Sequence, residues 1–297
     1  MHRDISLADP LPANDMWQEE AERQLGRTIV ATRLLGGGDF AESFWCELDD
    51  GNEVFAKTHK NPPPDFFTTE AAGLGWLRVG GHACVPQVLA VGNTPPLLVL
   101  EWIEPGSATS ETEPAFGRAL ARLHQEPFEC FGRPDKKTTG SQAMDNTPSD
   151  SWNEFYADRR LLPLAEKAAK LGAVPAGLAA AVANLASNID RYTGPAASPS
   201  CLHGDLWAGN RMVDRAGTSW LIDPASFGGD REFDLALMSL FGGFSSQVFD
   251  AYDEVFPLAD GWRERVPLHQ LATLLVHAIK FGGSYVGAVE AATNRYR

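Results

Sequence analysis

The chain has 297 residues, about twice the length of an average domain, so it can form one large domain or two lobes with a sizeable core. Hydrophobic residues make up 44% and charged residues 22%, and no apolar run approaches a membrane span, which excludes disordered, collagen-like and transmembrane classes. With 25 Lys and Arg against 39 Asp and Glu, the formal charge of −14 repels nucleic acids and anionic membranes, so neither is an expected partner.

The four cysteines and the first residues bear on location. The cysteines are scattered without a C-x-x-C pair, and the chain begins without the apolar run of a signal peptide. We therefore expect a reducing, cytoplasmic location in which the thiols pack in the core. Composition does not fix the oligomeric state, and we favour a monomer.

The first hundred residues alternate between helical and strand periodicity. The expected elements are a helix over 17–27, strands over 29–35, 44–48 and 53–57, a helix over 66–79, and strands over 85–91 and 97–103. Turn-type clusters separate the strands, which predicts an antiparallel meander. A breaking segment at 104–107 then ends the run, so we expect a first domain over 1–104.

Long helical patterns dominate the expected second domain, 105–297. The expected elements are helices over 113–125, 151–171 and 175–192, a polar loop over 133–149, a hairpin of strands 210–213 and 219–222, and helices from 235 onward broken at the glycine pairs 242–243 and 282–283. Five aromatic residues of the last third are expected in the core: Phe241, Phe244, Phe249, Tyr252 and Phe256.

One constellation around the predicted hairpin carries chemistry. Asp205 stands before the hairpin, Asn210 five residues later, and Asp223 directly after it. Side chains so spaced can converge at one end of a hairpin, where carboxylates and an amide oxygen suit Mg²⁺. This is the layout of kinases, in which the first Asp accepts the proton of the attacking hydroxyl while the Asn and the later Asp hold the metal. The alternative is a polar loop without catalytic function.

A kinase also requires groups that hold ATP, and the first domain offers them in order. Gly36, Gly37 and Gly38 between two strands can let backbone N–H groups approach phosphates, or can be an ordinary hairpin turn. Lys57 ends the third strand and Glu70 lies on the next helix, the arrangement of a phosphate-binding lysine and its ion-pair partner. Residues Glu101, Trp102 and Ile103 are expected to contact adenine as a hinge.

Three departures from protein kinases narrow the acceptor. Asp223 precedes Pro224 and Ala225, and the fixed φ of proline argues against a mobile metal-binding switch. Only eight residues separate Asp223 from Glu232, too few for a segment that docks peptides. No arginine precedes the catalytic Asp to pair with a regulatory phosphate. We therefore expect a small molecule or an exposed adduct as acceptor.

At this point the sequence resembles the fructosamine kinases, or ketosamine-3-kinases, which are related to aminoglycoside and choline phosphotransferases. The resemblance is strongest over 202–210, where tryptophan follows Asp-Leu, and extends through 222–227, 231–236 and 240–244. Matches at 152–156, 160–161, His277 and 281–285 carry it across nearly the whole chain.

The resemblance implies an α+β, two-lobed, protein-kinase-like fold with a five-stranded antiparallel N-terminal sheet and a mainly helical C-terminal lobe. It implies ATP-dependent phosphorylation of the sugar 3-hydroxyl of ketosamines, free or on protein lysines, followed by release of the amine. Asp205 would accept the proton, Asn210 and Asp223 would hold Mg²⁺, and Lys57 with Glu70 would steady the phosphates of ATP in a cleft between the lobes. The loop 133–149 follows the family pattern only loosely, so its role stays undefined.

Three side chains near the motif have two interpretations each. Trp207 can stack on a sugar or fix the catalytic loop from the core. His203 is expected to pack and hydrogen-bond beneath the loop rather than titrate in catalysis, and Asp234 to accept N–H bonds from the loop rather than bind a metal ion. Two other functions stay open: phosphorylation of another small hydroxyl compound, such as an aminoglycoside or amino alcohol, and nucleotide binding without catalysis.

Overall fold

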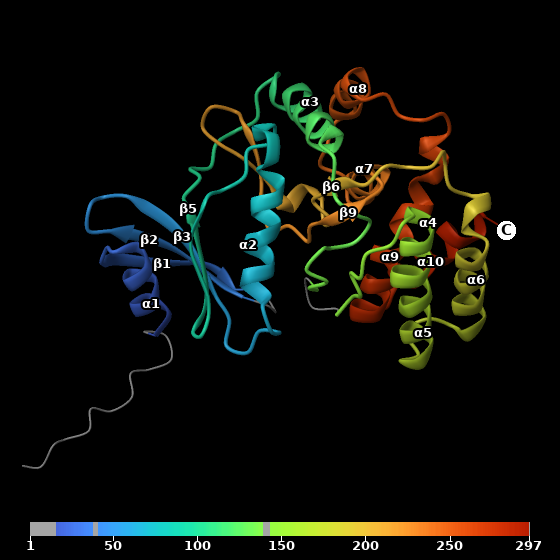
Figure 1. The fold of residues 1–297 in the computed structure, drawn as a ribbon, viewed down its shortest axis with the longest axis horizontal. Coiled ribbons are helices and arrows are strands. Elements are labelled where there is room, and N and C mark those ends of the chain that lie inside the picture. Colours follow the sequence, from blue (N-terminus) through green and yellow to red (C-terminus); the bar gives the residue numbers. More distant parts are fainter. Residues whose placement is uncertain (1–15, 38–40, 139–142, 297) are drawn as a thin grey trace, which may run out of the picture. The chain divides into compact units, whose positions relative to one another are not determined.

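The computed structural model describes residues 16–37, 41–138 and 143–296 (Figure 1). Contacts group the described chain into two compact units. The first contains the described residues up to Ala71 and Gln87–Trp102, and the second contains Ala72–Pro86 and the described residues from Ile103 onward. The division expected from sequence, 1–104 and 105–297, differs from this grouping at residues 72–86 and 103–104, which belong to the second unit.

The first unit is built on one antiparallel sheet. Its strands are β1 (Ile29–Gly37), β2 (Glu42–Leu48), β3 (Glu53–Thr58), β4 (Val88–Asn93) and β5 (Pro96–Glu101), in the order β1-β2-β3-β5-β4. Helix α1 (Met16–Leu25) packs on it, and the Trp17 and Phe44 rings stack with centroids 5.0 Å apart. The expected five-stranded antiparallel sheet is therefore confirmed, with β4 beginning three residues later than expected.

Helix α2 (Phe66–Leu77) spans the division between the units at residues 71 and 72. Two short strand pairs lie in the described part of the second unit. Strand β6 (Ser200–Leu202) pairs with β9 (Phe227–Gly229), and β7 (Arg211–Val213) pairs with β8 (Ser219–Leu221). The hairpin β7–β8 was expected, whereas β6 and β9 were not, because three-residue buried strands leave no periodicity to read.

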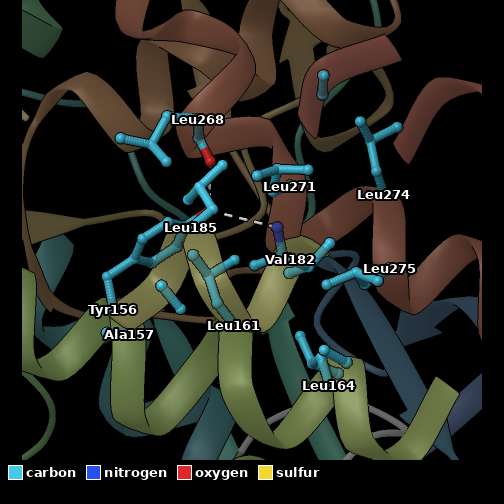
Figure 2. Close-up of a cluster of buried hydrophobic side chains, with 14 of the residues drawn as sticks. Tyr156, Ala157, Leu161, Leu164, Val182, Leu185, Leu268, Leu271, Leu274 and Leu275 are labelled. Carbon is cyan, nitrogen blue, oxygen red and sulfur yellow. Dashed lines mark hydrogen bonds between the residues drawn. The ribbon is translucent and has the colours of Figure 1, made fainter. Parts of the chain in front are cut away.

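The helices of the second unit hold its core. They are α3 (Thr112–Gln125), α4 (Trp152–Tyr156), α5 (Leu162–Lys170), α6 (Ala176–Ser187), α7 (Glu232–Leu240), α8 (Ser246–Val255), α9 (Trp262–Phe281) and α10 (Ser284–Asn294). Figure 2 shows leucines of α5, α6 and α9 meeting around Tyr156, whose hydroxyl donates to the Leu268 carbonyl at 2.8 Å. The helix expected over 151–171 is interrupted by a π-helical turn at Ala157–Leu161.

One expectation about this part of the chain needs correction. Phe241 was expected in the core, but its side chain is 44% exposed, because it follows the last turn of α7 just before the glycine pair 242–243.

Across the ranges that the structure describes, every helix is too short or too polar to cross a bilayer.

Candidate functional site

The loop that carries Asp205 begins where β6 ends, and we call it the catalytic loop after the role expected from sequence. Gly204 has φ +80°, and a Cβ there would lie 2.3 Å from the Ala225 carbonyl oxygen, so only glycine fits this turn. The buried carboxylate of Asp234 in α7 accepts hydrogen bonds from the backbone N–H of His203 at 2.7 Å and of Gly204 at 2.9 Å. Asp234 thus has the contacts expected from sequence, and it fixes the backbone immediately before Asp205.

His203 lies fully buried beneath the loop. Its Nε2–H donates to the Ile222 carbonyl at 2.9 Å, and its Nδ1 accepts the Asp205 N–H at 3.3 Å, which defines the neutral Nε2–H tautomer. The ring therefore joins the loop carrying Asp205 to the segment that leads to Asp223. His203 therefore packs and hydrogen-bonds beneath the loop, as expected from sequence.

Asp205 and Asn210 are in direct contact. The Asn210 amide Nδ2 donates to the Asp205 carboxylate Oδ2 at 3.0 Å and to the Asp205 carbonyl at 2.8 Å. Burial raises the pKa of Asp205 above its ordinary value, and the nearby negative charge of Asp223 adds to the rise, whereas the Asn210 hydrogen bond opposes it. A carboxylate with a raised pKa is better suited to accept a proton than an exposed one.

Asp223 follows β8 in a left-handed conformation with φ +54°. The segment is held on both sides, because Ile222 N–H donates to the Asn210 carbonyl at 3.0 Å and Ala225 N–H donates to the His203 carbonyl at 2.9 Å. Asp205, Asn210 and Asp223 are thus gathered at one end of the hairpin, as the spacing predicted. An amide oxygen and carboxylates form the hard oxygen donor set that Mg²⁺ prefers, so these residues fit that ion.

Trp207 lies two residues after Asp205 and is 40% exposed, so it is not a core residue. A Cβ at Gly209 would come within 2.2 Å of the Trp207 ring, so glycine is needed beside it. The edge-to-face contact with Phe241, at 6.1 Å between centroids, supports its orientation.

The first unit brings together Lys57 of β3 and Glu70 of α2. The Lys57 Nζ lies 2.9 Å from the Glu70 Oε1, and the two residues are only 7% and 9% exposed. Burial of both charges makes this pair more than a surface ion pair, since isolated buried charges are costly.

The remaining predicted residues of the first unit are less defined. Gly36 and Gly37 end β1, where a Cβ at Gly36 would meet nothing within 4 Å, and Gly38 lies outside the described residues. Glu101 ends β5, and its N–H donates to the Gln87 carbonyl at 3.0 Å. Trp102 is the last residue of the first unit, and Ile103, 8% exposed, belongs to the second.

Sequence reasoning missed two residues that support the site. Arg133 is fully buried at the start of the loop 133–149, stacks 4.2 Å from the Trp76 ring centroid, and donates to the Ser226 carbonyl at 2.7 Å, just after Asp223. His124 of α3 lies with its Nε2 3.4 Å from the Asp234 Oδ2. Neither lies in a motif, so only the tertiary contacts reveal them.

A second polar cluster is formed by residues that follow the catalytic loop in sequence. Asp230, Glu232 and His269 have ligand atoms within 4.8 Å of one another. However, Arg265 donates to both oxygens of Glu232, at 2.8 and 2.7 Å, so a cation already occupies this carboxylate. We therefore interpret the cluster as an ion-pair network of the fold rather than a metal site.

Comparison with known proteins identifies the family. A model of the fructosamine kinase family matches residues 14–296. A protein of Lactiplantibacillus plantarum named "Probable ketoamine kinase" is 34% identical over 272 residues, which cover 90% of this chain and 95% of the relative.

Solved structures give the same result. A Thermobifida fusca protein assigned provisionally as a fructosamine-3-kinase aligns with a TM-score of 0.88 and 37% identity, covering 94% of this chain and 97% of that one. A thermostable mutant of an aminoglycoside phosphotransferase, in complex with ADP and hygromycin B, aligns with a TM-score of 0.62 at 10% identity, over 94% and 98% of the two chains. The second likeness shows the fold alone, and it confirms the expected α+β, protein-kinase-like class. The chain belongs to the fructosamine kinase family, and it is a kinase of that family.

Proposed function

We propose that the protein uses ATP to phosphorylate the 3-hydroxyl of the sugar in ketosamines, the adducts of sugars with amines or protein lysines. The phosphorylated adduct then eliminates phosphate and frees the amine. The observation that carries the proposal is the Asp205 carboxylate, hydrogen-bonded to Asn210 at 3.0 Å beside Asp223, in a chain of the fructosamine kinase family.

Asp205 is the proposed proton acceptor. The acceptor O–H would pass its proton to the carboxylate as the hydroxyl oxygen bonds to the γ-phosphorus of ATP, and the bond from that phosphorus to the bridging oxygen breaks to release ADP. The Oδ2 of Asp205 accepts from Asn210, whereas Oδ1 accepts no hydrogen bond from the described residues, which suits Oδ1 to take the proton. The raised pKa of Asp205 favours this transfer.

Asn210 and Asp223 are the proposed ligands of Mg²⁺. Because Asn210 Nδ2 is engaged with Asp205, the amide oxygen is the atom left for the metal. The bound ion would offset the negative charge of the phosphates. The backbone bonds that hold Ile222 and Ala225 keep Asp223 in place for this role.

The groups of the first unit are proposed to bind the nucleotide. Lys57, oriented by its ion pair with Glu70, would contact the α- and β-phosphates. Gly36, Gly37 and Gly38 would cover the phosphates, and the backbone of Glu101, Trp102 and Ile103 would contact adenine. The ADP bound to the aminoglycoside phosphotransferase of the same fold supports ATP as the donor.

The acceptor panel tests the proposal. Purified protein is incubated with Mg·ATP and fructosamine, ribulosamine, erythrulosamine, an aminoglycoside or choline, and ³¹P NMR locates the new phosphate. We expect transfer to O3 of a ketosamine, and loss of at least about a thousandfold in kcat for Asp205→Asn.

The exposed Asp250→Asn on α8 serves as the matched control and is expected to keep wild-type turnover. Retained turnover in Asp205→Asn would remove the role of Asp205, and a higher kcat/KM for the aminoglycoside or choline would replace the ketosamine. Binding of Mg·ATP with no transfer to any acceptor would favour a nucleotide-binding module without catalysis.

A further inference from the structure

Four rings form a connected group at the ends of α7, α9 and α10, here called the aromatic surface: Phe241, His277, Phe281 and Tyr285. The His277 ring stacks on Tyr285 at 4.9 Å and on Phe281 at 5.6 Å, and it meets Phe241 edge to face at 5.3 Å. Phe241 and Phe281 are 44% and 59% exposed. Exposed aromatic side chains in a connected group are typical of a binding surface, whereas single exposed ones are ordinary.

The aromatic surface is continuous with the catalytic loop. Phe241 contacts Trp207, which lies two residues from Asp205, with ring centroids 6.1 Å apart. Just beyond Phe241, a Cβ on Gly243 would lie 2.4 Å from the Ala208 Cβ, so the two segments touch. A molecule that reaches Asp205 beside Trp207 therefore has this surface next to it.

The surface stays apolar at neutral pH. Burial lowers the pKa of His277, and the positive charge of Lys280 lowers it further, so the imidazole is neutral. The His277 Nδ1 is buried without a hydrogen bond. The Lys280 Nζ lies 5.4 Å from the Phe281 ring centroid, at the edge of this surface. An apolar group is the best-suited occupant of this surface, because its transfer from water carries no desolvation penalty.

We propose that the aromatic surface binds the amine-derived substituent of the acceptor and selects ketosamines whose nitrogen carries an alkyl chain, as a lysine side chain does. This inference rests on the proposed function. With the sugar held near Asp205 and Trp207, the substituent on the sugar nitrogen is the part that extends beyond them. The four methylenes of a lysine side chain match an apolar surface, whereas the carboxylate of an α-amino acid adduct does not.

A homologous series of acceptors tests this inference. The kcat/KM of wild type is measured for the N-methyl, N-butyl and N-hexyl fructosamines, and it should rise by about two- to fourfold for each methylene that becomes buried. Phe241→Ala should flatten this dependence, lowering kcat/KM for the N-butyl and N-hexyl acceptors by about four- to tenfold more than for the N-methyl acceptor.

Phe249→Ala is the matched control. Phe249 stacks on Trp262 at 6.0 Å and makes no described ring contact with the aromatic surface, so this variant should keep the wild-type dependence on chain length. A wild-type kcat/KM that does not change with chain length, or equal dependences in wild type and Phe241→Ala, would overturn the inference.

Two further measurements separate the possible failures. If no ketosamine is phosphorylated, the proposed function fails, and calorimetric dissociation constants of the same ligands for wild type and Phe241→Ala decide the inference on its own. Sedimentation of both proteins tests the other occupant of such a surface, a second copy of the chain. A dimer that Phe241→Ala converts to monomers, with no change in acceptor preference, would assign the surface to self-association.

Discussion

Asp205 combines a functional position with an unfavourable environment. Because burial raises its pKa, the folded protein binds this proton more tightly than the unfolded chain does. The free energy of unfolding therefore falls as pH rises from the ordinary pKa of the carboxyl through the raised one, and the loss persists at pH 7. The ionised Asp205 carboxylate thus lowers the stability of the fold at the position proposed to accept the proton.

Replacing this charge should stabilise the protein. We expect Asp205→Asn, although inactive, to raise the free energy of unfolding at pH 7 by about 0.5–2 kcal/mol, the range found when a functional residue's cost is removed. Asparagine keeps an oxygen for the Asn210 N–H and carries no charge. Urea unfolding of both proteins measures the difference, and a destabilised Asp205→Asn would show that the carboxylate supports the fold.

At the residue scale, the sequence predicted the site residues that lie close together along the chain, but not those that support the site from distant segments. Asp205, Asn210 and Asp223 are joined by a short hairpin, so their convergence follows from chain geometry. The contact between Lys57 and Glu70 could be predicted because a strand and the following helix carry them. Arg133 and His124 act through contacts with distant segments, and no local pattern marks a buried arginine or histidine as a partner of the site.

At the scale of elements, one ion pair links two helices of the second unit. Glu232 in the first turn of α7 accepts two hydrogen bonds from Arg265 of α9. Burial alone would raise the pKa of Glu232, but the hydrogen bonds and electrostatic attraction of Arg265 and His269 together outweigh it and bring the pKa down to about 2. A lowered carboxyl pKa stabilises the fold above the ordinary value of 4.5, and that stability is lost as pH falls toward 2.

Arg265→Met should therefore destabilise the protein by about 3–5 kcal/mol at pH 7, because it removes both arginine hydrogen bonds from the buried Glu232 carboxylate. The loss should shrink between pH 4.5 and 2, as Glu232 becomes protonated in the variant at a higher pH than in wild type. Arg263→Met, at an exposed position of the same helix, is the control, with an expected change below about 0.5 kcal/mol. Equal losses in the two variants would contradict the coupling.

Element boundaries were predictable where periodicity is long. Helices α1, α2 and α3 lie within two residues of the expected ranges at each end, because amphipathic spacing persists over several turns. Strands β6 and β9 escaped prediction since three buried residues do not define a period. Phe241 was placed in the core on hydrophobicity alone, which cannot separate a buried ring from an exposed one.

At the scale of the whole molecule, nucleotide binding offers a test that does not require an acceptor. Mg·ATP at about 100 times its Kd should stabilise the folded protein by about 2.7 kcal/mol, seen as a rise in Tm. In Lys57→Met this rise should largely disappear, because the proposed phosphate contact is lost. Lys60→Met, at an exposed position nearby, should keep it. A full rise in Lys57→Met would remove Lys57 from the nucleotide site.

The fold class was predictable because family motifs run along nearly the whole chain. The grouping into units was harder, since segment 72–86 continues the α2 helix yet contacts the second unit. No sequence pattern marks the point within α2 where the chain passes to the second unit. A single boundary cannot describe a first unit that consists of two separate segments of the chain.

The backbone around Asp223 has a consequence for inhibitor design. This aspartate has a left-handed backbone conformation and is followed by a proline. Hydrogen bonds donated by the backbone N–H groups of Ile222 and Ala225 hold its segment against the hairpin. Compounds that bind only when this aspartate turns away from the hairpin are therefore not expected to inhibit the protein. Selective ligands should instead be sought among those that accept the inward aspartate and exploit the adjoining rings.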